Sequence, residues 1–223
     1  MAYMKPFADY FGNERIIMKI QTFTVGTMGT NCYFLIDEND GSCIVVDPGA
    51  EADRLYGKLS ERGLTVQAIF LTHAHFDHIM ALPQLREKTG APVYVHEADE
   101  ELLTDNDKNL MNRFCSAPVR NLPADRHYGE GDSIRFGTEM LRILHTPGHT
   151  PGSVCIAAGE ELLTGDTLFR GGAGRYDFYK GSFSQLQSSL KRLSGLQTDY
   201  RIRPGHGASS HLFFEKETNA YLI

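Results

Sequence analysis

The stretch LTHAHFDHI, residues 71–79, restricts what this chain can fold into more than any other feature of its sequence. Within six positions it places His73, His75, Asp77 and His78. On a helix, residues two apart point in nearly opposite directions, and on a regular strand His78 would face away from the other three. The four side chains can converge only if the backbone turns sharply after residue 75. The apolar run QAIFL at 67–71 predicts a strand just before the cluster, and loops at strand ends often carry active sites.

Imidazole and carboxylate groups are the usual ligands of zinc and iron in proteins. A patch of surface histidines is the simpler alternative explanation of the cluster. Three more candidate ligands lie downstream, each directly after a predicted strand: His149 in HTPGHTPGS, Asp166 in LLTGDTLF and His206 in RPGHG. The glycines beside His206 allow the backbone to come close to a ligand. Packed sheets could bring these strand ends together at one edge, so the sequence favours a composite metal site.

Apolar periodicity and turn residues predict alternating strands and helices along the chain. The expected strands cover 19–25, 32–36, 43–46, 67–71, 92–95, 133–136, 139–145, 153–157, 161–164 and 200–203. The expected helices cover 51–62, 78–89, 183–194 and about 210–220, and the polar segment 97–131 is expected to be a helix followed by a long loop. Both halves begin with strands and continue with strand–helix alternation. This pattern indicates an α/β fold in four layers, with two packed sheets and helices outside.

No repeat or low-complexity linker divides the chain, so residues 18–223 are expected to form a single catalytic domain. Residues 1–17 precede the first strand-like segment and are expected to be an N-terminal extension. They contain charged residues and no apolar stretch of signal-peptide length. Apolar runs elsewhere are too short to cross a bilayer. We therefore expect a cytoplasmic protein without a membrane partner.

The charge of the chain argues against nucleic acid as a partner. It carries 22 Lys and Arg against 28 Asp and Glu, a net charge of −6, and no basic run is longer than two residues. Binding to phosphates needs clustered Lys and Arg. The four cysteines show no C-x-x-C spacing and are expected to be reduced thiols, mostly buried.

The motifs THAHFDH, HTPGHT, GDTLF and PGHG, in this order, resemble those of the metallo-β-lactamase superfamily, and specifically its glyoxalase II-like (hydroxyacylglutathione hydrolase-like) hydrolases. The resemblance covers about residues 18–222. It implies a four-layer αββα sandwich that binds two divalent metal ions, with zinc as the expected metal and iron or manganese as alternatives. The first ion would be held by His73, His75 and His149, the second by Asp77, His78 and His206, and Asp166 would bridge them.

The resemblance also implies a reaction, the hydrolysis of a small-molecule thioester. Two divalent ions close together lower the pKa of a shared water toward neutrality and so provide a hydroxide nucleophile. Asp77 would be the catalytic residue that orients this hydroxide, in addition to binding metal. Asp47, in VVDPG, resembles the aspartate that supports the metal-binding histidines in this family. A plain turn residue before Pro48 is the alternative for Asp47.

Two departures from the family pattern concern the substrate. Only 17 residues follow His206, so the helical domain with which glutathione-specific members grip their tripeptide is not expected here. In GRYDF, residues 174–178, Arg175 stands where those members place a basic residue for a substrate carboxylate. Arg175 is therefore a candidate for binding a substrate anion. An internal ion pair between Arg175 and Asp177 is the alternative.

A persulfide dioxygenase is the alternative function. Dioxygenases of this kind share the fold and the G-R-x-D-F stretch but use a single iron, which here would be held by His73, His149 and Asp166. The stretches HTPGHTPGS and PGHGASS resemble the hydrolase forms of these motifs and favour hydrolysis. Neither the natural thioester nor the oligomeric state follows from the sequence.

Overall fold

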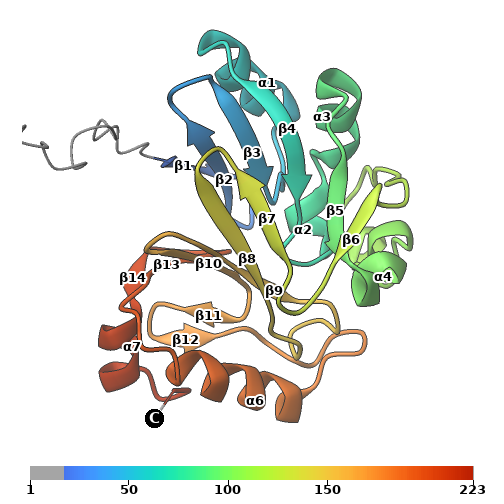
Figure 1. Ribbon diagram of the computed structural model, residues 1–223. Helices are drawn as coiled ribbons and strands as arrows, with labels where there is room; N and C mark the ends of the chain where they lie inside the picture. Colours follow the sequence, from blue (N-terminus) through green and yellow to red (C-terminus); the bar gives the residue numbers. More distant parts are fainter. Residues whose placement is uncertain (1–17, 223) are drawn as a thin grey trace, which may run out of the picture.

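Two six-stranded sheets stacked face to face form the centre of the computed structural model, which describes residues 18–222 (Figure 1). The extension predicted for residues 1–17 lies outside the described residues. The strands of the first sheet are, in spatial order, β1 (Met18–Val25), β2 (Thr30–Asp37), β3 (Ser42–Val46), β4 (Thr65–Phe70), β5 (Val93–His96) and β6 (Arg126–Tyr128). The pairs from β1 to β3 are antiparallel and those from β3 to β6 are parallel, so the sheet is mixed.

The second sheet is also mixed, because only β10 and β13 pair in parallel. Its strands are, in spatial order, β14 (Ser210–His211), β13 (Arg201–Pro204), β10 (Glu161–Gly165), β9 (Val154–Ala158), β8 (Glu139–His145) and β7 (Ser133–Phe136). A separate two-stranded ribbon consists of β11 (Leu168–Phe169) and β12 (Gly172–Ala173).

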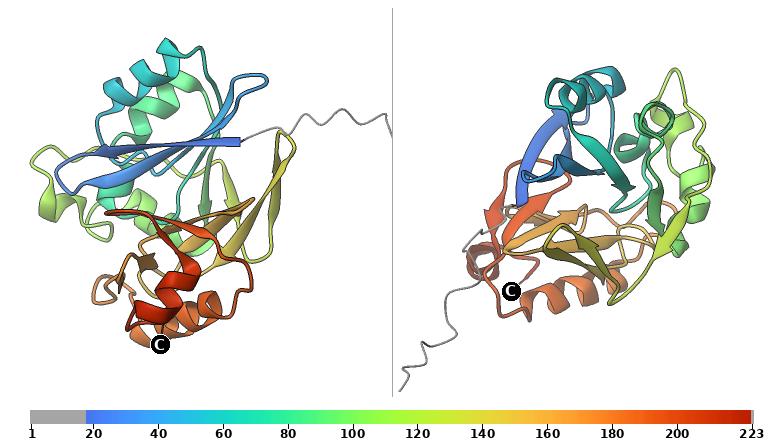
Figure 2. Two further views of the ribbon diagram at one scale, coloured as in Figure 1. Left: turned by 90° about the vertical axis from the view of Figure 1, so that its left-hand side faces the viewer. Right: turned by 45° about the horizontal axis from the view of Figure 1, so that its top comes forward.

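Helices cover both outer faces of the paired sheets, as Figures 1 and 2 show. The first sheet carries α1 (Ala52–Glu61) and α3 (Leu82–Thr89), and the second carries α6 (Phe183–Ser194) and α7 (Leu212–Thr218). Three apolar cores separate these layers, one between the sheets and one beneath each set of helices. Alternate residues of β2 enter different cores: Phe34 lies on the helix side and Leu35 lies between the sheets, as the two-residue period of a strand requires. The predicted four-layer αββα sandwich is confirmed.

The first helix shows how local sequence determines an element. Ala52, Leu55 and Leu59 are its buried residues, and they recur at the spacing of one helical face. The chain then leaves the helix through Gly63, whose φ of +61° suits a residue without a side chain. The amide of Leu64 donates back to the carbonyl of Leu59 at 2.9 Å, which confirms the predicted helix end.

The helix predicted over 78–89 is wrong in its boundaries, because two helices occupy this region. The first, α2 (Phe76–Ile79), is a single turn, and α3 begins only at Leu82. Pro83 lies in the first turn of α3, where a residue without an N–H fits best. The early start of α2 brings Asp77 and His78 onto a helix rather than a loop.

Segment 97–131 is also more structured than predicted. It contains a 3₁₀ turn, η1 (Glu97–Asp99), the helices α4 (Glu100–Thr104) and α5 (Met111–Phe114), and strand β6, which extends the first sheet. Such short elements offer too few residues for a periodic pattern. Among residues 18–222 the structure has no helix long and apolar enough to cross a membrane.

Candidate metal centre

The seven candidate ligands and the supporting residue Asp47 lie where five strands end at the same edge of the sandwich. Asp47 follows β3, the cluster at 72–78 follows β4, and the later candidates follow strands of the second sheet. These later residues are His149 after β8, Asp166 after β10 and His206 after β13. All seven predicted metal ligands are brought together here, from both sheets.

The backbone turns after residue 75, as the spacing of the cluster predicts. His75 is extended, with φ −72° and ψ 152°, and helix α2 begins at Phe76. The turn directs His73 and His75 toward the same point as Asp77 and His78, although neither a regular strand nor a helix could bring all four side chains together. The four residues therefore converge because a strand-end loop passes directly into a helical turn.

Three imidazoles form the first group. His73, His75 and His149 are buried, and each offers a ring nitrogen within 4.8 Å of those of the other two. His75 Nδ1 and His149 Nε2 are 2.8 Å apart, close enough to share one ion. The first group therefore has the composition of a three-histidine metal site.

The second group combines a carboxylate with two imidazoles, Asp77, His78 and His206. His206 Nε2 lies 3.1 Å from Asp77 Oδ2 and 3.4 Å from Asp166 Oδ2. The other oxygen of Asp166 lies 3.4 Å from His78 Nε2, and Asp166 Oδ2 lies 3.6 Å from His149 Nε2 of the first group. Asp166 therefore stands between the two groups, where a carboxylate that binds two ions has to be.

Several buried polar atoms of the cluster have no hydrogen-bond partner among the described residues. Of the five such side-chain atoms, three belong to the cluster, namely His73 Nε2, His75 Nε2 and Asp166 Oδ1. A buried polar atom left without a partner costs about 1–3 kcal/mol. Metal ions would satisfy His73 Nε2 and Asp166 Oδ1, whereas His75 offers its Nδ1 to the ion shared with His149, and the donor set suits zinc, iron or manganese. The residues present therefore fit divalent metal ions.

The outward nitrogens of His78, His149 and His206 are held by other groups, which directs their Nε2 atoms inward. His78 Nδ1 lies 3.0 Å from Asp47 Oδ2, and His149 Nδ1 lies 2.7 Å from the carbonyl of Arg175. His206 Nδ1 lies 3.2 Å from the carbonyl of Met28. Metal-binding histidines usually have such outer partners, which fix the tautomer and the ring orientation.

The electrostatics of the two groups differ. Burial lowers the pKa of His73, His75 and His149, that of His75 to about 3, so these rings are neutral and can donate a lone pair. Burial also lowers the pKa of His206, but hydrogen bonds to Asp166 and Asp77 outweigh it and raise the pKa to about 9. The carboxylates thus make the second group favourable for positive charge, from protons or from a metal ion.

Asp99 is a residue of the site region that the sequence did not reveal. Its carboxylate is fully buried and accepts hydrogen bonds from Ala74 N (3.0 Å), Thr150 Oγ1 (2.8 Å) and Gly152 N (2.6 Å). Ala74 stands between two candidate ligands, and Thr150 follows a third, so Asp99 joins two ligand loops. In the acidic stretch HEADEE it has no local signal that separates it from a surface residue.

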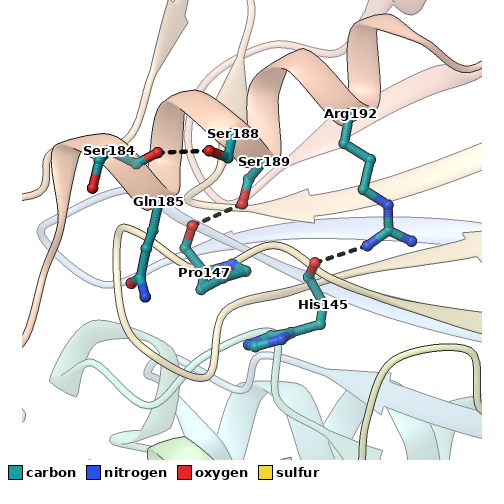
Figure 3. A pocket seen from close by; sticks show the side chains of 7 residues that line it. All are labelled: His145, Pro147, Ser184, Gln185, Ser188, Ser189 and Arg192. Carbon is teal, nitrogen blue, oxygen red and sulfur yellow. Dashed lines mark hydrogen bonds between the residues drawn. The ribbon is translucent and has the colours of Figure 1, made fainter.

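Helix α6 fixes the loop that carries His149. Ser189 Oγ donates to the carbonyl of Pro147 at 2.7 Å, and Arg192 Nη1 donates to that of His145 at 3.1 Å (Figure 3). The hollow in Figure 3 lies between α6 and this turn, and its lining does not include any of the candidate ligands. The hollow therefore marks the packing contact between α6 and the loop that carries His149.

A cavity of about 460 Å³ opens onto the two ligand groups. Phe114 lines it from α5, while its neighbour Met111 points into the core, so α5 both packs on the first sheet and walls the site. Arg175 also lines the cavity. Its guanidinium is paired with Asp177 through two bonds of 2.7 Å, which is the internal pair that the sequence left as the alternative.

Comparison with known sequences places the chain among metal-dependent hydrolases. The profile of the metallo-β-lactamase superfamily matches residues 25–206. A probable metallo-hydrolase of Bacillus subtilis is 39% identical over 209 residues, which cover 92% of this chain and 98% of that protein. The hydroxyacylglutathione hydrolase GloC of Haemophilus influenzae is 33% identical over 209 residues, with the same two coverages.

Comparison with solved structures gives the same fold. The B3 metallo-β-lactamase BLEG-1 superposes with a TM-score of 0.87 at 33% identity, covering 92% of this chain and all of that one. The protein TTHA1623, solved in a di-iron-bound form, reaches 0.81 at 35% identity, covering 91% of this chain and all of that one. ETHE1 from Myxococcus xanthus superposes with a TM-score of 0.73 at 31% identity, and the match covers 91% of this chain and 84% of that one.

Proposed function

The chain belongs to the metallo-β-lactamase superfamily and is a metal-dependent hydrolase, and from this premise we propose that it hydrolyses thioesters in the manner of glyoxalase II. One observation carries the proposal. Two complete ligand groups share Asp166 at the floor of a cavity large enough for a small molecule. Such an arrangement suits a reaction in which a water attacks a carbonyl between two ions.

In this proposal His73, His75 and His149 would hold one ion, Asp77, His78 and His206 would hold the other, and Asp166 would be a ligand of both. When bound, the pair of ions would supply a water of near-neutral pKa and polarise the thioester carbonyl. Zinc is the proposed metal, with iron or manganese as alternatives, and the di-iron form of the similar protein TTHA1623 supports a site that accepts iron.

The role proposed for Asp77 is to orient the attacking water. Burial raises the pKa of Asp77, but the neighbouring His78 and His206 outweigh it and lower the pKa, so the carboxylate stays ionised. Thr30 Oγ1 donates to Asp77 Oδ2 at 3.1 Å and fixes the carboxylate at the cavity wall. An ionised, oriented carboxylate can accept a hydrogen bond from the water and direct its lone pair to the carbonyl carbon.

A persulfide dioxygenase is the second candidate function, and the structural similarity to ETHE1 is the observation that favours it. Its single iron would need only His73, His149 and Asp166. The second group of Asp77, His78 and His206 is then without a function, although its ligand atoms lie within 4.8 Å of one another. The complete second group favours the two-metal hydrolase.

The test is the metal content of protein purified without added metal or chelating resin, together with two assays. Release of thiol from S-lactoylglutathione and simpler thioesters measures hydrolysis, and oxygen uptake with glutathione persulfide measures the alternative. Two ions per chain, with thioester turnover that a chelator abolishes, would support the proposal. One iron per chain with oxygen uptake and no thiol release would establish the dioxygenase instead.

A further inference from the structure

We propose that the substrate is an apolar thioester without a charged carrier, an inference that rests on the proposed thioester hydrolysis. The cavity above the ligand groups has walls of apolar side chains, which are Met28, Phe76, Leu110, Phe114, Phe169 and Phe178. They come from the loop before β2, from α2, from α5 and the residue before it, and from the ribbon of β11 and β12 with the loop that follows it. Apolar groups therefore surround the reacting centre on several sides.

Two of these side chains are more exposed than large apolar residues usually are. Phe114 is 52% exposed and Met28 is 55% exposed, and both line the cavity. Phe114 stacks on Phe76 at a centroid distance of 5.3 Å and an interplanar angle of 19°, so these two rings form one continuous aromatic part of the wall. An exposed apolar surface inside a cavity is characteristic of a site that covers an apolar ligand.

The charges of the cavity disfavour an anionic carrier such as a peptide with free carboxylates. Among the described residues that line it, Arg175 is the only lysine or arginine. Both oxygens of Asp177 already engage Arg175, and the guanidinium lies 3.9 Å from the ring centroid of Phe178. A substrate carboxylate would have to displace Asp177 to reach this guanidinium, and apart from the proposed metal ligands no other basic side chain among the described residues lines the cavity.

The test is turnover of a matched series by the metal-loaded protein. The series is acetyl, butyryl, hexanoyl and octanoyl N-acetylcysteamine, the corresponding S-alkyl thioacetates, and S-lactoylglutathione. Burial of one methylene is worth about a fourfold change in kcat/KM, so kcat/KM should rise at least tenfold from the two-carbon to the six-carbon member of one series. S-lactoylglutathione should be a poorer substrate than that six-carbon thioester.

A pair of variants locates the effect. Phe114→Ala should lower kcat/KM at least fivefold for the six-carbon thioester and less than twofold for the acetyl compound. Leu122→Ala removes a similarly exposed apolar side chain that does not line the cavity, and it should leave both values unchanged. Calorimetry with the unreactive S-hexyl and S-ethyl thioethers of N-acetylcysteamine measures binding to the apolar wall in the absence of catalysis. The hexyl compound should bind more tightly than the ethyl compound.

The outcomes separate the two proposals. Values of kcat/KM that stay flat or fall with chain length, with S-lactoylglutathione the best substrate, would overturn the apolar class and leave thioester hydrolysis intact. Equal binding of the two thioethers would overturn it as well. If no thioester is hydrolysed but the hexyl thioether binds more tightly, the proposed function fails and the apolar preference of the cavity stands.

Discussion

Asp47 combines a backbone role with support of the site. It takes a φ of +52°, as a turn residue before Pro48 can, and its carboxylate also accepts hydrogen bonds from both the amide (2.7 Å) and the hydroxyl (2.6 Å) of Thr72. The same carboxylate lies 3.0 Å from His78 Nδ1. Asp47 therefore has the backbone conformation of a turn residue and also the contacts that a supporting role needs, because a short side chain at a turn can reach back to the next strand end.

Asp47→Asn should lower the affinity for metal about 10- to 100-fold, the usual effect of losing such an outer partner. Asparagine tolerates a positive φ, but one of its two polar atoms is a donor and cannot accept from Thr72 or His78. Competition with a chelator of known affinity measures the change. Asp53→Asn, on the exposed face of α1, is the control, and equal affinities in the two variants would contradict the prediction.

Asp99 makes stability depend on pH. Burial raises its pKa from 3.8 to about 6 and outweighs the three hydrogen bonds, which lower it. The folded protein therefore keeps a proton that the unfolded chain releases between these values. The contribution of Asp99 to the free energy of unfolding is complete below about pH 4 and is lost as the pH rises through about 6.

Asp99→Asn removes this titration. The free energy of unfolding of the wild type minus that of the variant should fall by about 2 kcal/mol between pH 4 and 6.5, since one pKa unit corresponds to ~1.4 kcal/mol. Urea unfolding of both proteins in the presence of a chelator measures the difference at each pH. If the free energy of unfolding of the wild type minus that of the variant instead grew with pH, the hydrogen bonds would outweigh burial in setting the pKa of Asp99.

At the level of elements, strand ends and close backbone contacts determine where the ligands stand. The loop after β13 is held to the start of β2, because Asn31 N donates to the carbonyl of Gly205 at 2.7 Å. Gly205 N donates to the carbonyl of Gly165, the residue before Asp166, at 2.8 Å. A side chain at Gly205 would place its Cβ 2.1 Å from Asp166 Oδ1, so only glycine fits between these loops.

Gly205→Ala should therefore displace the His206 loop and lower both the second metal equivalent and the activity at least tenfold. Gly57→Ala is the matched control, because a Cβ there meets nothing within 4 Å in the middle of α1. The control should raise the free energy of unfolding by about 0.5–1 kcal/mol through helix propensity. Metal analysis, turnover and urea unfolding of both variants measure these effects, and a fully active Gly205→Ala protein would refute the steric argument.

Most of the regular elements could be predicted because their patterns are local. Except for β6 and β14, which the sequence does not predict as strands, the strands of both sheets and helices α1 and α6 follow the expected ranges within a few residues. The ribbon of β11 and β12 has two residues in each strand, and α2 and α5 have four each, too few for a period to be visible. Their positions depend on contacts with distant parts of the chain.

At the scale of the whole molecule, the proposed metal centre joins the two sheets. The ligands at 73–78 follow β4 of the first sheet, and His149, Asp166 and His206 follow strands of the second. Val154 N donates to the carbonyl of Thr72 at 2.9 Å, a direct bond between the two halves beside the site. Bound metal would act as a cross-link at this edge.

Metal removal should therefore destabilise the whole sandwich. At a free zinc concentration of a thousand times Kd, binding adds about 4 kcal/mol to the free energy of unfolding. Urea unfolding with zinc and with a chelator measures this gain. His206→Ala should show a smaller zinc-dependent gain than His211→Ala, which changes an exposed histidine outside the cluster, and an equal gain would argue against His206 as a ligand.

The sequence by itself determined the types of the main elements, their order and the candidate ligands, because side-chain chemistry and periodicity are properties of neighbouring residues. Only the tertiary structure decided which groups hold those ligands in place. Asp99 bonds to a residue 25 positions away, and His206 to the carbonyl of Met28, 178 positions away. The pairing of Arg175 with Asp177 and the aromatic wall of the same cavity are also products of folding, since a buried or paired side chain is defined by the atoms that surround it.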